Sequence, residues 1–223
     1  MENDRRLDEK KPFKIKVPCA CNQPSMKRYY INLAHRQDRR EQVEAEFARL
    51  GWPVTRINAM HVPERGALGC ALSHAAALRS FLEGDDKSES VCLVAEDDLA
   101  FVRDPRPDLA RFLAEFDETW DVLLLASNTQ REHPVHGKSF VTRVMDAQTT
   151  SCYAVTRAYA PTLLACFEES AAQLRQGWSS EACCDIMWKR LQPVGRWYCL
   201  YPKTAIQRPS FSDIEGRVTA YGV

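Results

Sequence analysis

A run of apolar residues that ends abruptly in three acids limits the possible folds more than any other feature of this sequence. Residues 91–95 read Val-Cys-Leu-Val-Ala without a polar interruption, and Glu96-Asp97-Asp98 follow at once. A continuous apolar run of this length is typical of a strand that is covered on both faces in a parallel sheet. We therefore expect a buried strand over residues 90–95 that carries three carboxylates at its carboxyl end.

The rest of the chain alternates between strand-like and helix-like segments. The expected strands cover residues 28–33, 53–59, 90–95, 121–126 and 150–155, and the expected helices cover residues 39–50, 66–82, 107–116 and 159–174. Alternation of this kind predicts an α/β fold, a mostly parallel Rossmann-like sheet with helices on both faces. The length of 223 residues suits one such domain.

The two ends of the chain differ from this middle part. Residues 1–25 are charged and lack any sustained hydrophobic period, so we expect a flexible tail there and a single domain over residues 26–223. From Gln192 onward the chain is rich in proline, glycine and aromatic residues. We expect this last part to form strands and loops that wrap back over a site.

Charge and cysteine usage exclude several classes of protein. Thirty basic and thirty acidic residues cancel, which speaks against a nucleic-acid partner. No apolar stretch approaches the roughly 20 residues of a membrane-spanning helix, and no secretory signal is visible, so we expect a cytoplasmic protein that is at most peripheral at a membrane. The nine cysteines include two close groups, Cys19-Ala-Cys21 and Cys183-Cys184, whose spacing does not match a structural zinc site. We interpret them as mostly buried thiols.

The three acids are placed where ligands bind in open α/β sheets, outside the carboxyl ends of the strands. Mg²⁺ and Mn²⁺ are held by one or two carboxylates together with substrate phosphates, which Asp97 and Asp98 could provide with Glu96 beside them. The simpler alternative is a solvated acidic turn or a helix N-cap. On these residues alone the two interpretations are about equally good.

Two further segments could complete an anion or nucleotide site. Asn32 ends the first expected strand, and Arg36 and Arg39 enter the following helix, where a phosphate could bind, although a solvated helix start explains them equally well. Ser73 and His74 follow a start with two glycines that allows close backbone approach. We expect both to bind or support a ligand, because a lone histidine on an apolar helix is seldom a catalyst.

A further acidic residue, Asp185, stands at the start of a short apolar segment near the C-terminus. It could be a helix N-cap and nothing more, as could Asp213.

These motifs resemble, in order and spacing, those of glycosyltransferase family 25, which includes bacterial lipooligosaccharide and procollagen galactosyltransferases. The resemblance spans roughly residues 28–215. It rests on Tyr30-Ile31-Asn32-Leu33 with Arg36 and Arg39-Arg40, on Gly66-x-x-Gly69-Cys70-x-x-Ser73-His74, on Leu93 to Asp98, on Cys152 to Val155, on Asp185, and on Pro202 through Gln207 to Ser212-Asp213-Ile214.

The resemblance implies a GT-A-like fold, a UDP-sugar donor that is often UDP-galactose, Mn²⁺ dependence, and transfer with inversion to a hydroxyl. Glu96-Asp97-Asp98 fall on the acidic metal motif of that family, and Asp185 falls on a downstream aspartate that we expect to be the general base. The expected partners are a UDP-sugar and a glycan or glycoconjugate acceptor. Two alternatives remain: a non-catalytic binding or adhesion protein with the same fold, and a metal-dependent phosphohydrolase, which would need a second cluster of ligands.

Overall fold

A computed structural model describes residues 26–84, 87–116, 119–212 and 217–219 of the chain. The predicted tail over residues 1–25 and Asp213 lie outside these ranges. In chain order the elements are β1 (Met26–Asn32), α1 (Gln37–Arg49), β2 (Thr55–Asn58), α2 (Gly66–Glu83), β3 (Val91–Glu96), β4 (Leu99–Phe101), α3 (Arg106–Glu115), β5 (Val122–Val135), β6 (Lys138–Thr156), α4 (Ala160–Gln176), α5 (Cys184–Met187), β7 (Trp197–Leu200), β8 (Ala205–Gln207), β9 (Ser210–Ser212) and β10 (Arg217–Thr219).

The central sheet has six strands in the order β2-β1-β3-β6-β5-β7. Strands β2, β1 and β3 pair in parallel, as do β5 and β7, whereas β6 is antiparallel to β3, β5 and β7. One strand therefore runs against the direction shared by the others. This arrangement confirms the predicted single α/β domain with a mostly parallel sheet.

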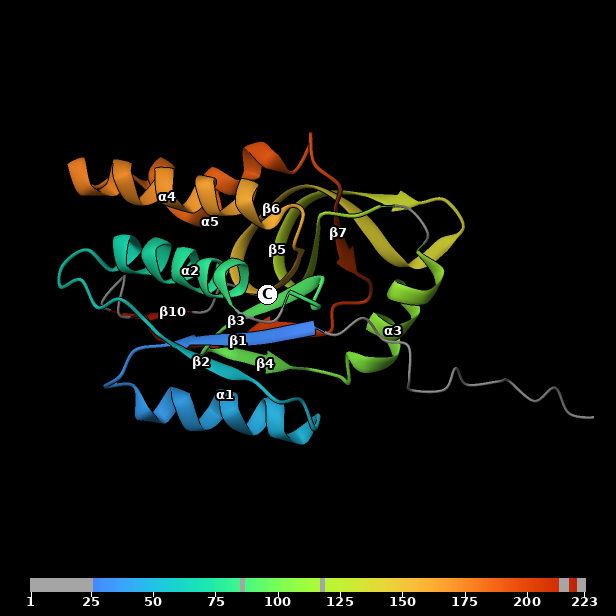
Figure 1. Cartoon of the computed structure of the whole chain (residues 1–223), viewed down its shortest axis with the longest axis horizontal. Coiled ribbons are helices and arrows are strands. Elements are labelled where there is room, and N and C mark those ends of the chain that lie inside the picture. The colour runs from blue at the N-terminus through green and yellow to red at the C-terminus, as the bar shows by residue number, and fades with distance from the viewer. Residues whose placement is uncertain (1–25, 85–86, 117–118, 213–216, 220–223) are drawn as a thin grey trace, which may run out of the picture.

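Helices cover both faces of the sheet, as predicted (Figure 1). One core cluster joins α2, α4 and α5 to one face of the sheet, and a second joins α1 and α3 to the other face. Strand β3 contributes to both, because Cys92 and Val94 pack in the first cluster and Leu93 and Ala95 in the second. Its unbroken apolar run is thus explained by burial from both sides.

The structure departs from the sequence-based prediction in the middle of the chain. The expected strands at 121–126 and 150–155 are parts of a long hairpin, β5 with β6, whose turn contains Gly137 at φ +71°. Its outer part is polar and partly exposed, so it lacks the apolar pattern that marks a buried strand. The sequence therefore showed only the buried base of each strand.

One small pairing ties the C-terminal part to the rest of the chain, and a second lies within the C-terminal part. Strand β8 pairs antiparallel with β4, directly after the acidic residues, and β10 pairs with β9. The prediction that the last part of the chain returns over a site is thereby confirmed for β8. None of the helices within the described ranges is both long and apolar enough to cross a membrane.

Candidate functional site

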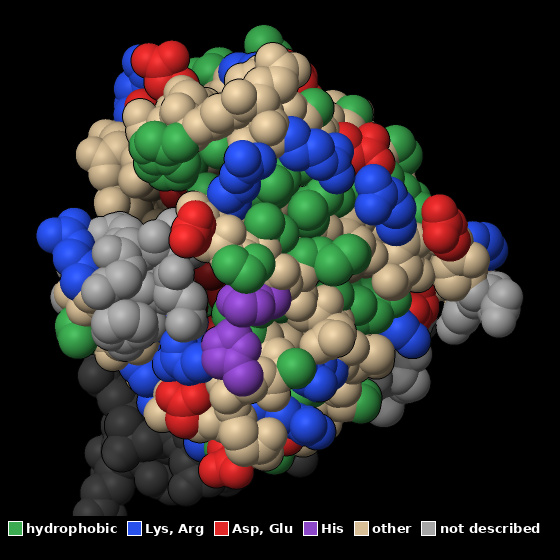
Figure 2. Space-filling view, turned by 90° about the vertical axis from the view of Figure 1, so that its left-hand side faces the viewer, with side chains coloured by type: hydrophobic (Ala, Val, Ile, Leu, Met, Phe, Trp, Pro, Cys, Tyr) green, Lys and Arg blue, Asp and Glu red, His purple; other side chains and the backbone are tan. Residues whose placement is uncertain are grey.

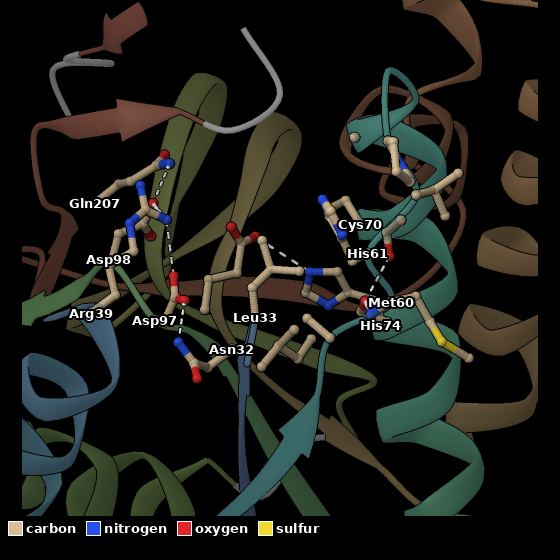
Figure 3. Close-up of a pocket in the computed structure, with 18 of the residues that line it drawn as sticks. Asn32, Leu33, Arg39, Met60, His61, Cys70, His74, Asp97, Asp98 and Gln207 are labelled. Carbon is tan, nitrogen blue, oxygen red and sulfur yellow. Dashed lines mark hydrogen bonds and ion pairs between the residues drawn. The ribbon is translucent and has the colours of Figure 1, made fainter. Parts of the chain in front are cut away.

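Most of the polar residues predicted for a site gather at the carboxyl edge of β1 and β3. They line a cavity of about 290 Å³ together with residues of α2 and of the segment before it. Figure 3 shows Asn32, Arg39, Asp97, Asp98 and Gln207 on one side of this cavity, and Met60, His61, Cys70 and His74 on the other side. We call the first group the acidic side and the second group the helix side.

Asp97 is held by hydrogen bonds to both of its carboxylate oxygens. The amide of Asn32 donates to Oδ2 at 2.8 Å, and Nη1 of Arg39 donates to Oδ1 at 2.9 Å. Burial raises the pKa of Asp97, while the charge of Arg39 acts to lower it. Asn32 is fixed in turn by Arg56, whose Nε donates to its Oδ1 at 3.0 Å. Asp97 is therefore a rigid, partly neutralised carboxylate.

Asp98 is only 4% exposed and less completely satisfied. Its Oδ2 accepts a hydrogen bond from Gln207 at 3.1 Å and lies 3.5 Å from Nη1 of Arg39. Its Oδ1 is buried without a hydrogen-bond partner among the described residues. Burial, followed by the charge of Glu96, raises the pKa of Asp98 to about 7. A buried carboxylate oxygen without a partner is costly and is the kind of atom that a bound cation would satisfy.

Arg39 supplies the positive charge of the acidic side. Its guanidinium contacts Asp97 and Asp98, and Nη2 donates to Oγ of Ser210 at 2.5 Å. The side chain of Arg39 is 12% exposed, and the two aspartate side chains are 9% and 6% exposed. These three residues therefore form a buried ion cluster, and removing one charged partner from such a cluster strongly destabilises the fold.

We expect Arg39→Met to lower the free energy of unfolding by about 3 kcal/mol, because two buried carboxylates lose their counter-charge. The loss should be smaller in acid, where protonation of Asp97 and Asp98 removes the repulsion. Urea unfolding at neutral and acidic pH measures both effects. The matched control is Arg40→Met, which breaks only a solvent-exposed pair with Glu44 and should therefore lower the stability much less. Equal losses in the two variants would contradict the buried-cluster interpretation.

Glu96 joins the acidic side to the helix side. Its Oε1 accepts a hydrogen bond from Oγ1 of Thr150 at 2.5 Å and lies 3.3 Å from Nε2 of His74. Although burial acts to lower the pKa of His74, hydrogen bonds with Cys70 and Glu96 raise it to about 10. The other ring nitrogen, Nδ1, lies 3.1 Å from the hydroxyl of Tyr153. His74 is thus an oriented residue with defined contacts at both nitrogens.

The start of α2 approaches the preceding segment very closely. A Cβ added to Gly69 would lie 2.3 Å from the carbonyl oxygen of Met60. Ser73 fixes the same contact, because its hydroxyl donates to the carbonyl of Gly69 at 2.6 Å and accepts from the amide of Met60 at 2.8 Å. Ser73 therefore shapes the cavity wall, and its hydroxyl is already fully engaged.

Gly69→Ala should destabilise the protein by about 2 kcal/mol, because the added methyl group would force the backbone of Met60 away from α2. Gly177→Ala is the control, since a Cβ there has no neighbour within 4 Å. Denaturant unfolding of both variants checks the difference. If Gly69→Ala unfolded like the wild type, the close approach would not be a real constraint.

Two predicted site residues lie outside the residues that line this cavity. Arg36 forms an ion pair with Asp38 in the first turn of α1. Asp185 lies in the first turn of α5, where its Oδ2 accepts a hydrogen bond from the amide of Thr149 at 3.4 Å. The N-cap of α5 is Cys183, so the alternative that Asp185 is an N-cap is wrong. Burial raises the pKa of Asp185, and the nearby charge of Glu96 adds to this.

Several residues of the site could not be found from the sequence. Gln207 reaches Asp98 across 109 positions, and Thr150 reaches Glu96 across 54. His74 was predicted, and Cys70 lies four positions before it on the same face of the helix, which is a weak signal. Their ligand atoms and that of Glu96 lie within 4.8 Å of one another. Cys184 adds a second thiol 3.7 Å from that of Cys70, 114 positions away.

No protein-family model matches the chain, and no curated protein sequence matches it significantly. Among solved structures, A197 from STIV superposes with a TM-score of 0.51 at 11% identity, covering 89% of this chain and 94% of A197. A glycosyltransferase involved in glycosylation of the major capsid of PBCV-1 gives a TM-score of 0.48 at 10% identity, with 86% and 96% covered. A Drosophila galactosyltransferase 7 mutant, solved with manganese, UDP-Gal and xylobiose, gives 0.36 at 11% identity, with 89% and 71% covered. At such low identity a similarity concerns the fold alone. The predicted α/β class, with a mostly parallel sheet and helices on both faces, is confirmed by the strand order and the two core clusters.

Proposed function

We propose that this protein is a glycosyltransferase that moves a hexose, with galactose favoured, from a UDP-sugar to a hydroxyl group of a glycan or glycoconjugate. One observation carries the proposal. Asp98 presents a buried oxygen without a described partner at the carboxyl edge of a mostly parallel sheet, on the wall of a cavity of about 290 Å³. Ligands of α/β proteins bind at this edge. The order of the motifs along the chain supports membership of glycosyltransferase family 25.

The residues present fit a divalent cation with oxygen ligands. Oδ1 of Asp98 is available to Mn²⁺ or Mg²⁺, whereas both oxygens of Asp97 already accept hydrogen bonds from Asn32 and Arg39. Asp98 is therefore the first ligand, and Asp97 becomes the second if Arg39 turns toward the diphosphate. When bound, the cation supplies charge that stabilises the leaving UDP. Arg39 and the cation would then share the neutralisation of the diphosphate.

The cavity also has a suitable wall for a nucleoside. Leu33, Met60 and Val62 contribute apolar surface, and His61 packs edge-on against His35 with ring centroids 5.2 Å apart. Figure 2 shows two histidine side chains lying together on one face of the molecule, between apolar and basic side chains. Aromatic surface beside a charged group suits a uracil base joined to a diphosphate.

The proposed reaction is a single displacement. Asp185 takes the proton from the acceptor hydroxyl as that hydroxyl attacks the anomeric carbon, which gives inversion. Its raised pKa suits a general base, because proton transfer is most efficient when the pKa lies near the working pH. Asp185 is near enough to Glu96 for that charge to raise its pKa, and it lies outside the lining of the cavity. We assign it to the acceptor and not to the donor.

Binding of Mn²⁺ should strengthen with pH. Asp98 must be ionised to bind a cation, and its pKa is raised to about 7. We expect the Mn²⁺ dissociation constant to fall about tenfold between about pH 6 and about pH 8. The raised pKa also means that ionisation of Asp98 weakens the metal-free fold as pH rises through this range, so the thermal shift given by Mn²⁺ should be larger at the higher pH. A pH-independent Mn²⁺ affinity would contradict the role of Asp98.

The function is tested by incubating the protein with a panel of UDP-sugars and Mn²⁺, and by measuring UDP release with and without candidate acceptors. Acceptor-stimulated release from one UDP-sugar is the expected result. A bound UDP-sugar without release would favour the non-catalytic binding or adhesion protein. Phosphate release from the nucleotide would favour a metal-dependent phosphohydrolase.

A further inference from the structure

Four side chains with metal-binding atoms meet on the helix side of the cavity. Cys70 and His74 project from α2, Glu96 ends β3 and Cys184 begins α5. The sulfur, nitrogen and oxygen atoms of the first three lie within 4.8 Å of one another. Sγ of Cys184 is 3.7 Å from Sγ of Cys70, and both cysteines are free thiols.

These distances match the edges of a tetrahedral zinc centre. Bonds of about 2.3 Å to sulfur and about 2.0 Å to nitrogen or oxygen give tetrahedral edges of about 3.8 Å between two sulfurs and about 3.3 Å between nitrogen and oxygen. The observed edges are 3.7 Å for Cys70 with Cys184, and 3.3 Å for His74 Nε2 with Glu96 Oε1. Two of the six edges of the tetrahedron thus have the expected length, and the edges from Cys70 to His74 and to Glu96 are within 4.8 Å.

The neighbours of these residues orient them as metal ligands. Nδ1 of His74 lies 3.1 Å from the hydroxyl of Tyr153, so Nδ1–H can donate there while Nε2 faces the ion. Oε1 of Glu96 accepts the hydroxyl of Thr150. Zinc ligands are commonly fixed by such a second hydrogen bond, which sets the tautomer of the histidine and the direction of the carboxylate.

We propose that Cys70, His74, Glu96 and Cys184 form a zinc site that joins α2, β3 and α5 at the inner wall of the cavity. Thiolate and imidazole ligands favour Zn²⁺ over Mg²⁺ or Mn²⁺, and the thiol protons pass to the solvent as the Zn–S bonds form. The site is separate from Asp98 and does not depend on the transferase function. Because protein ligands fill all four coordination positions, the zinc is structural and offers no open position to a substrate.

The test uses the full chain, kept reduced, stripped of metal with a chelator and titrated with Co²⁺ as a spectroscopic probe. We expect a thiolate-to-cobalt charge-transfer band with the visible bands of tetrahedral cobalt, and loss of both when Zn²⁺ is added. Cys70→Ser and Cys184→Ser should each weaken Co²⁺ binding by at least about 100-fold. Cys183→Ser removes a neighbouring thiol outside the cluster and should keep the full spectrum, as should Asp98→Asn.

Alkylation of the wild-type protein provides a second measurement that needs no variant. Cys70 and Cys183 are both partly exposed, so added Zn²⁺ should protect Cys70 from a thiol reagent and leave Cys183 reactive. A wild-type protein without the charge-transfer band, or serine variants that retain it, would overturn the proposal. Equal labelling of Cys70 with and without Zn²⁺ would do the same.

Discussion

Asp98→Asn is expected to reduce Mn²⁺-dependent release of UDP by about 10³-fold, because the charge that holds the cation is lost while the shape of the side chain is kept. The folded protein should not lose stability. A neutral amide is cheaper to bury than a carboxylate whose Oδ1 has no described partner and whose pKa is already raised by burial and by the charge of Glu96. Steady-state UDP release and thermal unfolding of the same preparation check the two expectations together.

The control for this variant is Asp104→Asn, which neutralises an aspartate in the loop after β4 that is paired with Arg106. Its side chain is 39% exposed, so little change is expected in activity or in stability. Full Mn²⁺-dependent activity in Asp98→Asn would show that Asp98 does not bind the cation. The site proposed for zinc would be unaffected by that result, because its four ligands do not include Asp98.

Asp185→Asn should leave the affinity for the UDP-sugar unchanged and lower kcat by about 10³-fold, since an amide cannot accept the proton of the acceptor hydroxyl. The wild-type kcat should rise with pH and then level off, because only the ionised carboxylate is active and its pKa is raised by burial. Donor binding by calorimetry and turnover across pH separate the two effects. Loss of donor affinity together with turnover would instead indicate a structural role.

Glu181→Gln is the control for this second variant, because Glu181 is an exposed acid close to Asp185 in the chain. It should retain wild-type turnover. Unchanged turnover in Asp185→Asn would mean that another group accepts the proton, and the assignment of Asp185 as the base would have to be abandoned.

Most of the parallel core could be predicted from the sequence, because its signal is local. The apolar run before Glu96 and the hydrophobic period of α1 and α2 each lie within one segment of the chain. The reversed direction of β6 and the long hairpin could not be predicted, because a polar strand has no distinctive pattern and its pairing depends on distant partners.

The site residues also divide into those with a local sequence signal and those without one. Asn32, Asp97 and Asp98 end neighbouring strands and could be placed together from the topology alone. Gln207 and Cys184 contact site residues from the C-terminal part of the chain, and no local sequence pattern predicts these contacts. Arg36 was predicted to bind the nucleotide because it begins a helix, yet it pairs with Asp38 and lies outside the cavity lining. The assignment of Asp185 as the base stays a prediction.

The return of β8 to β4 has a consequence for how the protein is made. The amide of Gln207 and the backbone N–H of Arg208 hold the side chain and the carbonyl of Asp98, which was synthesised about a hundred residues earlier. Contacts between such distant parts of a chain form slowly, because a long loop must close first. On the ribosome, the sheet can begin to assemble well before the acidic side acquires these partners. The acidic side therefore acquires its full set of contacts late in biosynthesis, only after β8 has emerged.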